Sequence, residues 1–255
     1  MLPSDLVNYK KNSQKIIALT AWDSISGSIA EEANVDLVLV GDSLGNVVLG
    51  HETTIPVTVD DMIHHSKAVM RGVKQTIVIT DMPFMTYSIS IEDSLKNATK
   101  LIQEGGAHAV KCEVRESHLP TIDRFVKEGI QTMAHIGLQP QYINESGGYT
   151  LQGTSTDAQK QMISLAKSLS DIGVFAIVLE KVPIELSKTI TESINCPTIG
   201  IGAGPYCSGQ VLVTNDLLGL TPNFKPKFLK QYLNGAELIK NAISQFKSDV
   251  CSNQF

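Results

Sequence analysis

The sequence predicts an α/β protein built as a (β/α)8 TIM barrel. Short apolar runs rich in β-branched residues alternate with segments of helical period, a pattern typical of βα units around a parallel sheet. The runs number eight, and a length of 255 residues with 42% hydrophobic content suits one barrel. We therefore expect a single catalytic barrel domain over residues 1–255, with an open doubly wound sheet as the alternative.

The predicted strands are spaced so that a helix fits between most of them. The exception is the stretch from Gly204 to Gln210, which is too short for a full helix. The eight predicted strands are residues 16–19, 37–40, 77–80, 109–111, 132–134, 175–179, 198–201 and 211–213.

Helix start signals follow the second and third predicted strands. Thr58 and Asp61 have the spacing of a capping box, and Gly72 marks the end of that helix. Ser90 and Asp93 repeat the start signal ahead of an apolar stripe.

Two later helices are predicted in the same way. Apolar residues at 162, 165, 166, 169 and 172 form one face, and Gly173 follows the last of them. Pro183 suits the first turn of the next helix, where no N–H donor is needed.

Composition excludes several classes of partner. The net charge is −5 with acidic and basic residues interspersed, so no basic stripe is present and we expect no nucleic-acid partner. No run approaches the roughly 18 apolar residues of a membrane span, and the first residues lack the pattern of a signal peptide, so we expect a cytoplasmic protein with no membrane partner. The four cysteines form no Cys-x-x-Cys pair, which indicates ordinary thiols in a reducing compartment.

Three carboxylates each follow a different predicted strand. Asp42, Asp81 and Glu113 stand at the downstream ends of the second, third and fourth runs. Because the carboxyl ends of parallel barrel strands meet at one face, we expect the three side chains to be neighbours. Three oxygen ligands suit a hard cation such as Mg²⁺. Taken singly, Asp42 or Asp81 is better explained as a turn former or helix N-cap.

Further polar residues share this end of the predicted barrel. Lys111 and Glu113 lie two apart, so both can face the barrel mouth while Cys112 faces away; a simple ion pair between Lys111 and Glu113 is the alternative. His135 follows the fifth run, and a core histidine bonded to a backbone carbonyl explains it equally well.

Glu180 ends a very apolar run at residues 174–179. Desolvation there favours a role in proton transfer. The alternative is a pairing with the adjacent Lys181, although neighbours along a strand point to opposite faces. The glycines of residues 200–204 resemble a phosphate-binding turn, but a tight loop explains them too, and no Gly-x-Gly-x-x-Gly spacing is present.

Several motifs, in order, resemble the ketopantoate hydroxymethyltransferase family. They extend over most of the chain, from about residue 16 to residue 232, and so many in one order make chance an implausible explanation. The motifs are VGDSLG at 40–45, GHETTIPVT at 50–58, DMPFM at 81–85, AHIGLQPQ at 134–141, GGY and QG at 147–153, LEKVP at 179–183, and IGIGAG with GQ at 199–210.

The resemblance implies a phosphoenolpyruvate/pyruvate-like barrel enzyme of pantothenate and coenzyme A biosynthesis. It would transfer a hydroxymethyl group from 5,10-methylenetetrahydrofolate, its co-substrate, to 3-methyl-2-oxobutanoate (2-oxoisovalerate), giving 2-dehydropantoate (ketopantoate) and tetrahydrofolate through a Mg²⁺-stabilised enolate. It implies one Mg²⁺ per subunit and a homodecamer. The partners would be a small 2-oxo acid and a folate.

The same resemblance assigns roles to the residues at the strand ends. Glu180 would be the proton acceptor, and Lys111 would neutralise charge on the carboxylate or the developing enolate oxygen. The metal ligands would be Asp42, Asp81 and Glu113. The contacts to the 2-oxo acid would be Asp42, Ser43, Asp81, Lys111 and His135.

Two other functions are compatible with the same residues. One keeps the barrel and metal but cleaves or rearranges a 2-oxo acid, as related phosphoenolpyruvate and pyruvate enzymes do. The other is an inactive barrel that binds a phosphorylated metabolite at residues 200–204. Dependence on folate would distinguish the transferase from an enzyme that cleaves or rearranges a 2-oxo acid. Metal-dependent proton exchange would distinguish the transferase from the inactive binding protein.

Overall fold

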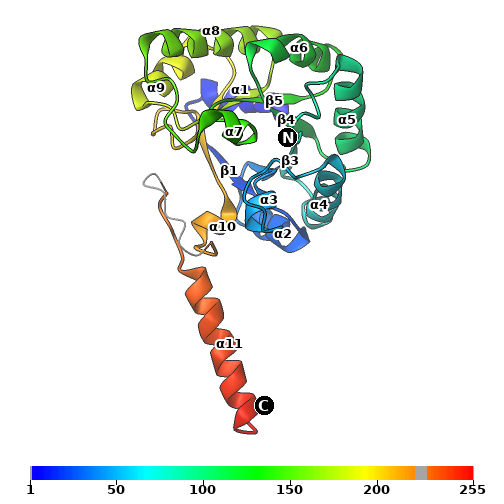
Figure 1. Cartoon of the computed structure of the whole chain (residues 1–255), viewed down its shortest axis with the longest axis vertical. Helices are drawn as coiled ribbons and strands as arrows, with labels where there is room; N and C mark the ends of the chain where they lie inside the picture. The colour runs from blue at the N-terminus through cyan, green and yellow to red at the C-terminus, as the bar shows by residue number, and fades with distance from the viewer. Residues whose placement is uncertain (1, 222–228, 255) are drawn as a thin grey trace. The chain divides into compact units, whose positions relative to one another are not determined.

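The computed structural model, which describes residues 2–221 and 229–254, contains a closed barrel of eight parallel strands in sequence order (Figure 1). The predicted fold class is therefore confirmed, and the open doubly wound sheet is excluded. The strands are β1 (Ile16–Thr20), β2 (Leu37–Val40), β3 (Ile77–Asp81), β4 (Ala109–Glu113), β5 (Thr132–Gly137), β6 (Ala176–Glu180), β7 (Thr198–Ile201) and β8 (Gly209–Leu212).

Most strands lie where the sequence predicts them, but β8 begins two residues earlier than expected. Ile199 of β7 pairs with Gly209, and Gly200 pairs with Gln210. The prediction began at residue 211 because glycine and glutamine have low strand propensity. Gly209 is required here by close packing, since a Cβ at this position would lie 2.4 Å from Ile16 O of β1.

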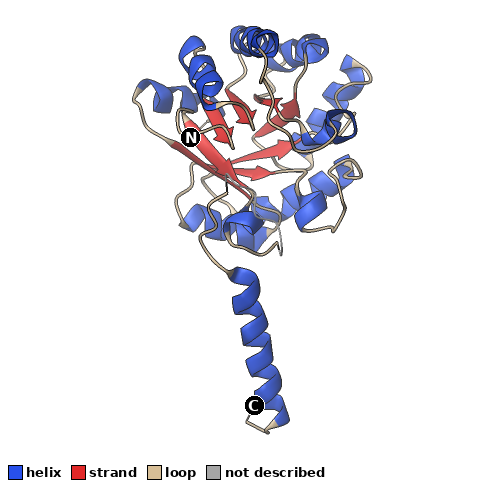
Figure 2. Cartoon of the chain, turned by 60° about the vertical axis from the view of Figure 1, so that its left-hand side comes forward, coloured by secondary structure: helices blue, strands red, loops and turns tan. Residues whose placement is uncertain are grey.

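Helices surround the strands of the barrel on their outer side (Figure 2). Capping residues in the sequence determine where these helices begin and end. Thr58 caps its helix with a capping box to Asp61, Ser90 caps the next, and Gly173 ends a third in the left-handed conformation. The helices within residues 1–211 are α1 (Leu6–Lys11), α2 (Ser24–Glu32), α3 (Leu44–Val47), α4 (Val59–Gly72), α5 (Ile91–Gln103), α6 (Leu119–Lys127), α7 (Ile143–Ser146), α8 (Thr156–Ile172) and α9 (Ile184–Ser193), with short 3-10 turns at Pro3–Asp5, Glu116–His118 and Pro140–Tyr142.

One helix start differs from the prediction by a residue. Pro183 is the N-cap of α9 rather than its first helical residue. Its ψ of 143° keeps it extended, and the ordered turn begins at Ile184. Proline supplies no N–H at either position, so the sequence signal could not distinguish the two.

Alternate residues of each strand face two separate apolar clusters. The inner cluster fills the barrel with side chains such as Leu39, Ile79 and Met133, and Leu6 of α1 joins it. The outer cluster joins the strands to the helices through residues such as Val110. This two-residue period decides which polar side chains at the strand ends face the barrel mouth.

The chain divides into two compact units, residues 1–211 and residues 212–255. The second unit contains α10 (Thr214–Leu217) and α11 (Gly235–Cys251) among its described residues. The prediction of a single domain across residues 1–255 stays a prediction. No helix in the described part of the chain has the length and apolar character to cross a bilayer.

Candidate active site

The polar residues expected at the strand ends come together at the carboxyl end of the barrel. Asp81, Glu113 and Glu180 are the last residues of β3, β4 and β6, and Asp42 follows β2. Strand register sets their neighbours, because Asp81 pairs with Lys111 and Glu113 pairs with His135. The sequence prediction of one shared face is correct for these residues.

Lys111 forms its ion pair across strands. Its Nζ lies 2.9 Å from Asp81 Oδ1, and both side chains are buried. Asp81 Oδ2 accepts a hydrogen bond from the Asp42 backbone N–H at 3.1 Å. Lys111 therefore joins the third and fourth strands, a different pairing from the Lys111–Glu113 ion pair considered from the sequence.

A buried glutamine connects two of the carboxylates, and sequence analysis missed it. Gln141 donates from Nε2 to Asp42 Oδ2 at 2.7 Å and from its backbone N–H to Glu113 Oε2 at 3.0 Å. Tyr87 donates from its hydroxyl to Gln141 Oε1 at 2.7 Å. Asp42 also stands in the turn after β2, but the N-cap of α3 is Ser43, so the Asp42 carboxylate serves Gln141 and not a helix cap. A fully buried Gln is rare, but the sequence alone does not reveal its burial.

His135 lies between two glutamates. Its Nε2 is 3.3 Å from Glu180 Oε2, and its Nδ1 is 3.7 Å from Glu113 Oε1. No hydrogen bond from either ring nitrogen to a backbone carbonyl is present, so His135 is not the carbonyl-bonded core histidine considered from the sequence. Burial, the largest influence, lowers the pKa of His135 and favours a neutral imidazole.

Burial of the carboxylates changes their protonation. Desolvation first, and then the negative charge of Asp81, raise the pKa of Asp42. Desolvation and the charge of Asp42 likewise raise the pKa of Glu113. For Lys111 desolvation acts in the opposite direction, but the charges of Asp81, Asp42 and Glu113 outweigh it and raise its pKa, which keeps the ammonium charged.

The donor set suits a divalent cation. Asp42, Asp81 and Glu113 are 4%, 2% and 1% exposed, and Lys111 is the cation buried among them, so carboxyl groups outnumber the ammonium group, and a bound cation would compensate their charge. Carboxylate oxygens are hard ligands of the kind that Mg²⁺ binds. Within residues 2–221 and 229–254, no three acidic, His or Cys side chains already stand in a metal-holding arrangement.

Ser43 and the glycine turn complete the set of predicted residues. Ser43 Oγ lies beside Gly41, as does Asp81 Oδ2: a Cβ at Gly41 would be 3.1 Å from the former and 3.5 Å from the latter. The turn between β7 and β8 is closed by Gln210, whose Nε2 donates to Gly204 O at 2.9 Å. Gly204 has a φ of +79°, so a steric reason explains this glycine without a bound phosphate.

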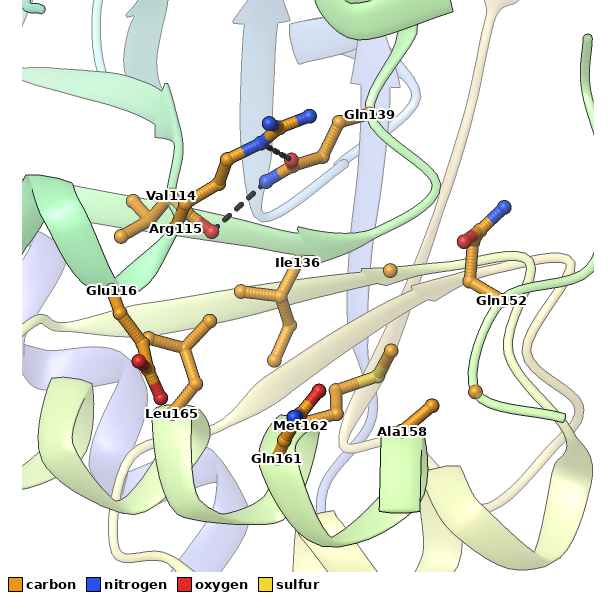
Figure 3. Close-up of a pocket in the computed structure, with 12 residues that line it drawn as sticks. Val114, Arg115, Glu116, Ile136, Gln139, Gln152, Ala158, Gln161, Met162 and Leu165 are labelled. Atoms are coloured by element: carbon orange, nitrogen blue, oxygen red, sulfur yellow. Dashed lines mark hydrogen bonds between the residues drawn. The ribbon is translucent and has the colours of Figure 1, made fainter. Parts of the chain in front are cut away.

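A cavity of about 340 Å³ lies beyond the outer face of β5. Figure 3 shows Ile136 facing Met162 and Leu165 of α8 across this space, with Arg115 and Gln139 at one edge and Gln152 at another. Gln139 donates to Val114 O at 2.9 Å and accepts from Arg115 Nε at 3.3 Å. The cavity is separate from the inward-facing carboxylates, because Ile136 and His135 face opposite sides of β5.

Comparison with known proteins identifies the family. The family model of ketopantoate hydroxymethyltransferase matches residues 2–255. The chain belongs to the ketopantoate hydroxymethyltransferase family. The family predicted from the sequence motifs is therefore confirmed, and so is the prediction that the protein is an enzyme.

Curated members of the ketopantoate hydroxymethyltransferase family match nearly the whole chain. A 3-methyl-2-oxobutanoate hydroxymethyltransferase of Thermosipho melanesiensis is 51% identical over 96% of this chain and 92% of its own length. One from Thermoanaerobacter sp. (strain X514) is 49% identical over 96% of this chain and 89% of its own length. One from Bacillus cereus (strain AH820) is 48% identical over 99% of this chain and 90% of its own length.

Solved structures agree on the fold. A phosphoenolpyruvate phosphomutase from Streptomyces platensis subsp. rosaceus superimposes with a TM-score of 0.65 at 11% identity, covering 99% of this chain and 88% of that chain. A 2,3-dimethylmalate lyase of the PEP mutase/isocitrate lyase superfamily gives a TM-score of 0.62 at 14% identity, covering 98% of this chain and 89% of that chain. Both structures share the (β/α)8 barrel fold that the sequence predicts for this chain.

Proposed function

We propose that this protein transfers the one-carbon group of 5,10-methylenetetrahydrofolate to 3-methyl-2-oxobutanoate as a hydroxymethyl group, with one water molecule consumed, giving ketopantoate and tetrahydrofolate. Family membership supports the reaction class. The observation that carries the proposal is that Glu180 Oε2 lies 3.3 Å from Nε2 of the buried His135, at the end of the barrel that also holds the buried Lys111–Asp81 pair. This arrangement has the base and the positive charge that removal of a proton next to a carbonyl requires.

Glu180 is the proposed proton acceptor. Its side chain is 16% exposed, compared with 2% for Glu113, so a substrate can reach it from the barrel mouth. The proton at C3 of the 2-oxo acid would pass to its Oε atom. His135 Nε2, at 3.3 Å, would orient the carboxylate and, as a neutral donor, would compete little for that proton.

Lys111 is proposed to bind the 2-oxo acid electrostatically. Its charge is preserved by the surrounding carboxylates, and it would offset negative charge on the carboxylate or the enolate oxygen. Ser43, which lies beside Asp42 at the same rim, would donate to the substrate carboxylate. The ammonium of Lys111 is held by its buried ion pair with Asp81, so this group needs little reorganisation during the reaction.

Mg²⁺ is the proposed metal, one per subunit, with Asp42, Asp81 and Glu113 as its ligands. When bound, it would supply Lewis-acid stabilisation of developing negative charge on the substrate. The surplus of buried carboxylate over ammonium supports this assignment. The place of the reaction in pantothenate and coenzyme A synthesis belongs to the same proposal.

Proton NMR in D₂O tests the proposal. The C3 proton signal of 2-oxoisovalerate is followed with protein and Mg²⁺, and methylenetetrahydrofolate is then added. We expect exchange of the C3 proton followed by ketopantoate. If the C3 proton exchanges but no ketopantoate forms after the donor is added, the protein would be a different enzyme that acts on 2-oxo acids. A folded, metal-loaded protein that gives no exchange would contradict the enolate chemistry itself.

A further inference from the structure

Lys181, directly after Glu180, has an unusual backbone conformation. Its φ is +45°, in the left-handed region that residues with side chains rarely adopt. Its N–H donates to Ile201 O of β7 at 2.9 Å, which fixes its place at the end of β6. Conformations of this kind persist only where surrounding contacts hold them, and they cluster at functional sites.

The same residue holds a second segment, residues 147–153, which we call the strap. Lys181 Nζ donates to Tyr149 O at 2.5 Å, and Lys181 O accepts from the Gln152 N–H at 2.9 Å. The strap is therefore bonded at two points to the residue that follows the proposed base.

Glycines mark both ends of the strap. Gly147, Gly148 and Gly153 have φ values of +65°, +127° and +72°. The strap contains no helix or strand after Gly147, so it lacks a ladder of backbone hydrogen bonds to hold it. Its contacts with Lys181 are consequently important for its position.

Tyr149 lies on the strap, where its backbone carbonyl accepts from Nζ of the residue that follows the proposed base. Desolvation first, and then the negative charges of Glu180, Asp42 and Glu113, raise the pKa of Tyr149, which indicates that its hydroxyl lies within electrostatic reach of the site. The side chain is nevertheless 48% exposed. A half-buried aromatic ring with an open face can stack on a planar ligand.

We propose that Lys181 is a positioning residue for the strap, and that Tyr149 on the strap stacks on the planar heteroaromatic ring of the one-carbon donor. The identity of that donor rests on the function proposed above. Strand side chains fill the floor of the barrel mouth, so the donor must approach the 2-oxo acid from the solvent side. The strap holds Tyr149 next to the residue that follows Glu180, with its side chain exposed to solvent.

Two assays would distinguish a role of Tyr149 in donor binding from a merely structural role. Exchange of the C3 proton without donor reports on Glu180, whereas kcat/KM for the donor reports on the complete reaction. We expect Tyr149→Leu to lower kcat/KM for the donor about tenfold more than it lowers exchange, mainly through KM. Tyr149→Phe, which keeps the ring, should recover most of that loss.

Lys181→Met tests the anchor, because methionine keeps the length and the backbone conformation of lysine but cannot donate to Tyr149 O. We expect the same selective loss as for Tyr149→Leu, with partial recovery in Lys181→Arg. Lys127→Met is the matched control, since Lys127 pairs with Asp123 on the exposed surface of α6. Equal losses of exchange and transfer, or an unchanged KM for the donor in Tyr149→Leu, would overturn the proposal.

Limited chymotrypsin digestion provides a readout that needs no activity. Cleavage after Tyr149 should be at least fivefold faster in Lys181→Met than in the wild type, and unchanged in Lys127→Met. Equal cleavage rates would show that Lys181 does not anchor the strap. If the wild-type protein transferred nothing to the 2-oxo acid, the proposed function would fail, yet this digestion would still decide the role of Lys181.

Discussion

At the scale of single residues, access distinguishes one carboxylate from the others. Asp42, Asp81 and Glu113 are almost fully buried, and each accepts a hydrogen bond or ion pair from the protein. Glu180 ends β6 at the rim of the mouth, with a more exposed side chain. A base must meet its substrate, so solvent access favours Glu180 over its neighbours.

Replacing Glu180 with glutamine removes the proposed base and keeps the shape of the side chain. We expect C3 exchange to fall by about 10²- to 10⁴-fold, because that is the usual contribution of a positioned general base. Proton NMR measures the exchange, and calorimetry measures Mg²⁺ affinity, which should change far less. Glu185→Gln on α9 is the control. Near-normal exchange in Glu180→Gln would mean that another group takes the proton.

Gly137 shows how closely β5 approaches the base. It pairs with Glu180 across the strands, has a φ of +97°, and a Cβ there would lie 2.3 Å from Glu180 O. Gly129 has a similar φ of +82°, but no atom lies within 4 Å of its Cβ position. A comparison of substitutions at the two glycines therefore distinguishes the cost of an unfavourable backbone conformation from the cost of a steric clash.

We expect Gly137→Ala to destabilise the protein by about 1 to 3 kcal/mol more than Gly129→Ala does, because only the first adds a clash to the strained backbone. C3 exchange should also fall in Gly137→Ala, since the clash displaces Glu180. Denaturant unfolding and the NMR exchange assay measure the two effects. Similar stabilities for the two variants would indicate that β5 and β6 separate easily.

At the scale of elements, one carboxylate holds the turn that leads into β3. Glu31, in α2, accepts backbone hydrogen bonds from Lys74, Gln75 and Thr76 at 2.9 to 3.1 Å. Desolvation opposes its ionisation, but the bonds from Gln75, Thr76 and Lys74 outweigh it and lower the pKa of Glu31 to about 2. The unfolded chain would have a pKa near the ordinary 4.5.

This difference in pKa gives stability a defined pH dependence. The contribution of Glu31 is fully present above about pH 4.5 and is lost as the pH falls toward 2, because only the ionised group is favoured by folding. Glu31 is partly exposed, so solvent screening reduces its effect to about 1 to 2 kcal/mol.

Urea unfolding of Glu31→Gln at pH 7 and pH 3 measures the contribution. We expect the variant to be less stable than the wild type at pH 7 and the difference to shrink at pH 3. Glu32→Gln, one residue further along α2, is the matched control. A difference that stays constant with pH would show that shape, and not charge, holds the turn.

At the scale of the whole molecule, α11 presents an apolar surface. Its large apolar side chains lie on one broad arc of the helix, and they are 47% to 62% exposed. They are Leu238, Ile239, Ile243, Phe246 and Val250. A stripe of this kind normally packs against another surface. The expected homodecamer would cover it with a second copy of the chain.

Charges placed on that arc should weaken assembly. We expect Ile239→Lys combined with Ile243→Lys to lower the mass measured by sedimentation velocity toward that of the monomer. Ser244→Lys combined with Ser248→Lys adds the same charge on the opposite side of α11 and should leave the mass unchanged. If both pairs gave the wild-type mass, this arc would not be an assembly surface.

The sequence predicted the site to the extent that strand geometry determines it. Asp81, Glu113 and Glu180 end apolar runs, and parallel strands bring such ends together without further information. The contact of Gln141 with Asp42 spans 99 residues and depends on the conformation of a loop, so no local pattern reveals it. The position of β8 depends on packing at Gly209, a non-local property that propensity does not include.

The alternation along β4 has a consequence for a saturation scan of this strand. Val110 and Cys112 belong to the outer cluster, whereas Lys111 and Glu113 face the mouth. Substitutions at 110 and 112 should reduce the amount of protein that accumulates in cells. Those at 111 and 113 should leave the amount closer to normal while abolishing complementation of a pantothenate auxotroph. Abundance and complementation plotted along the strand would alternate with a period of two.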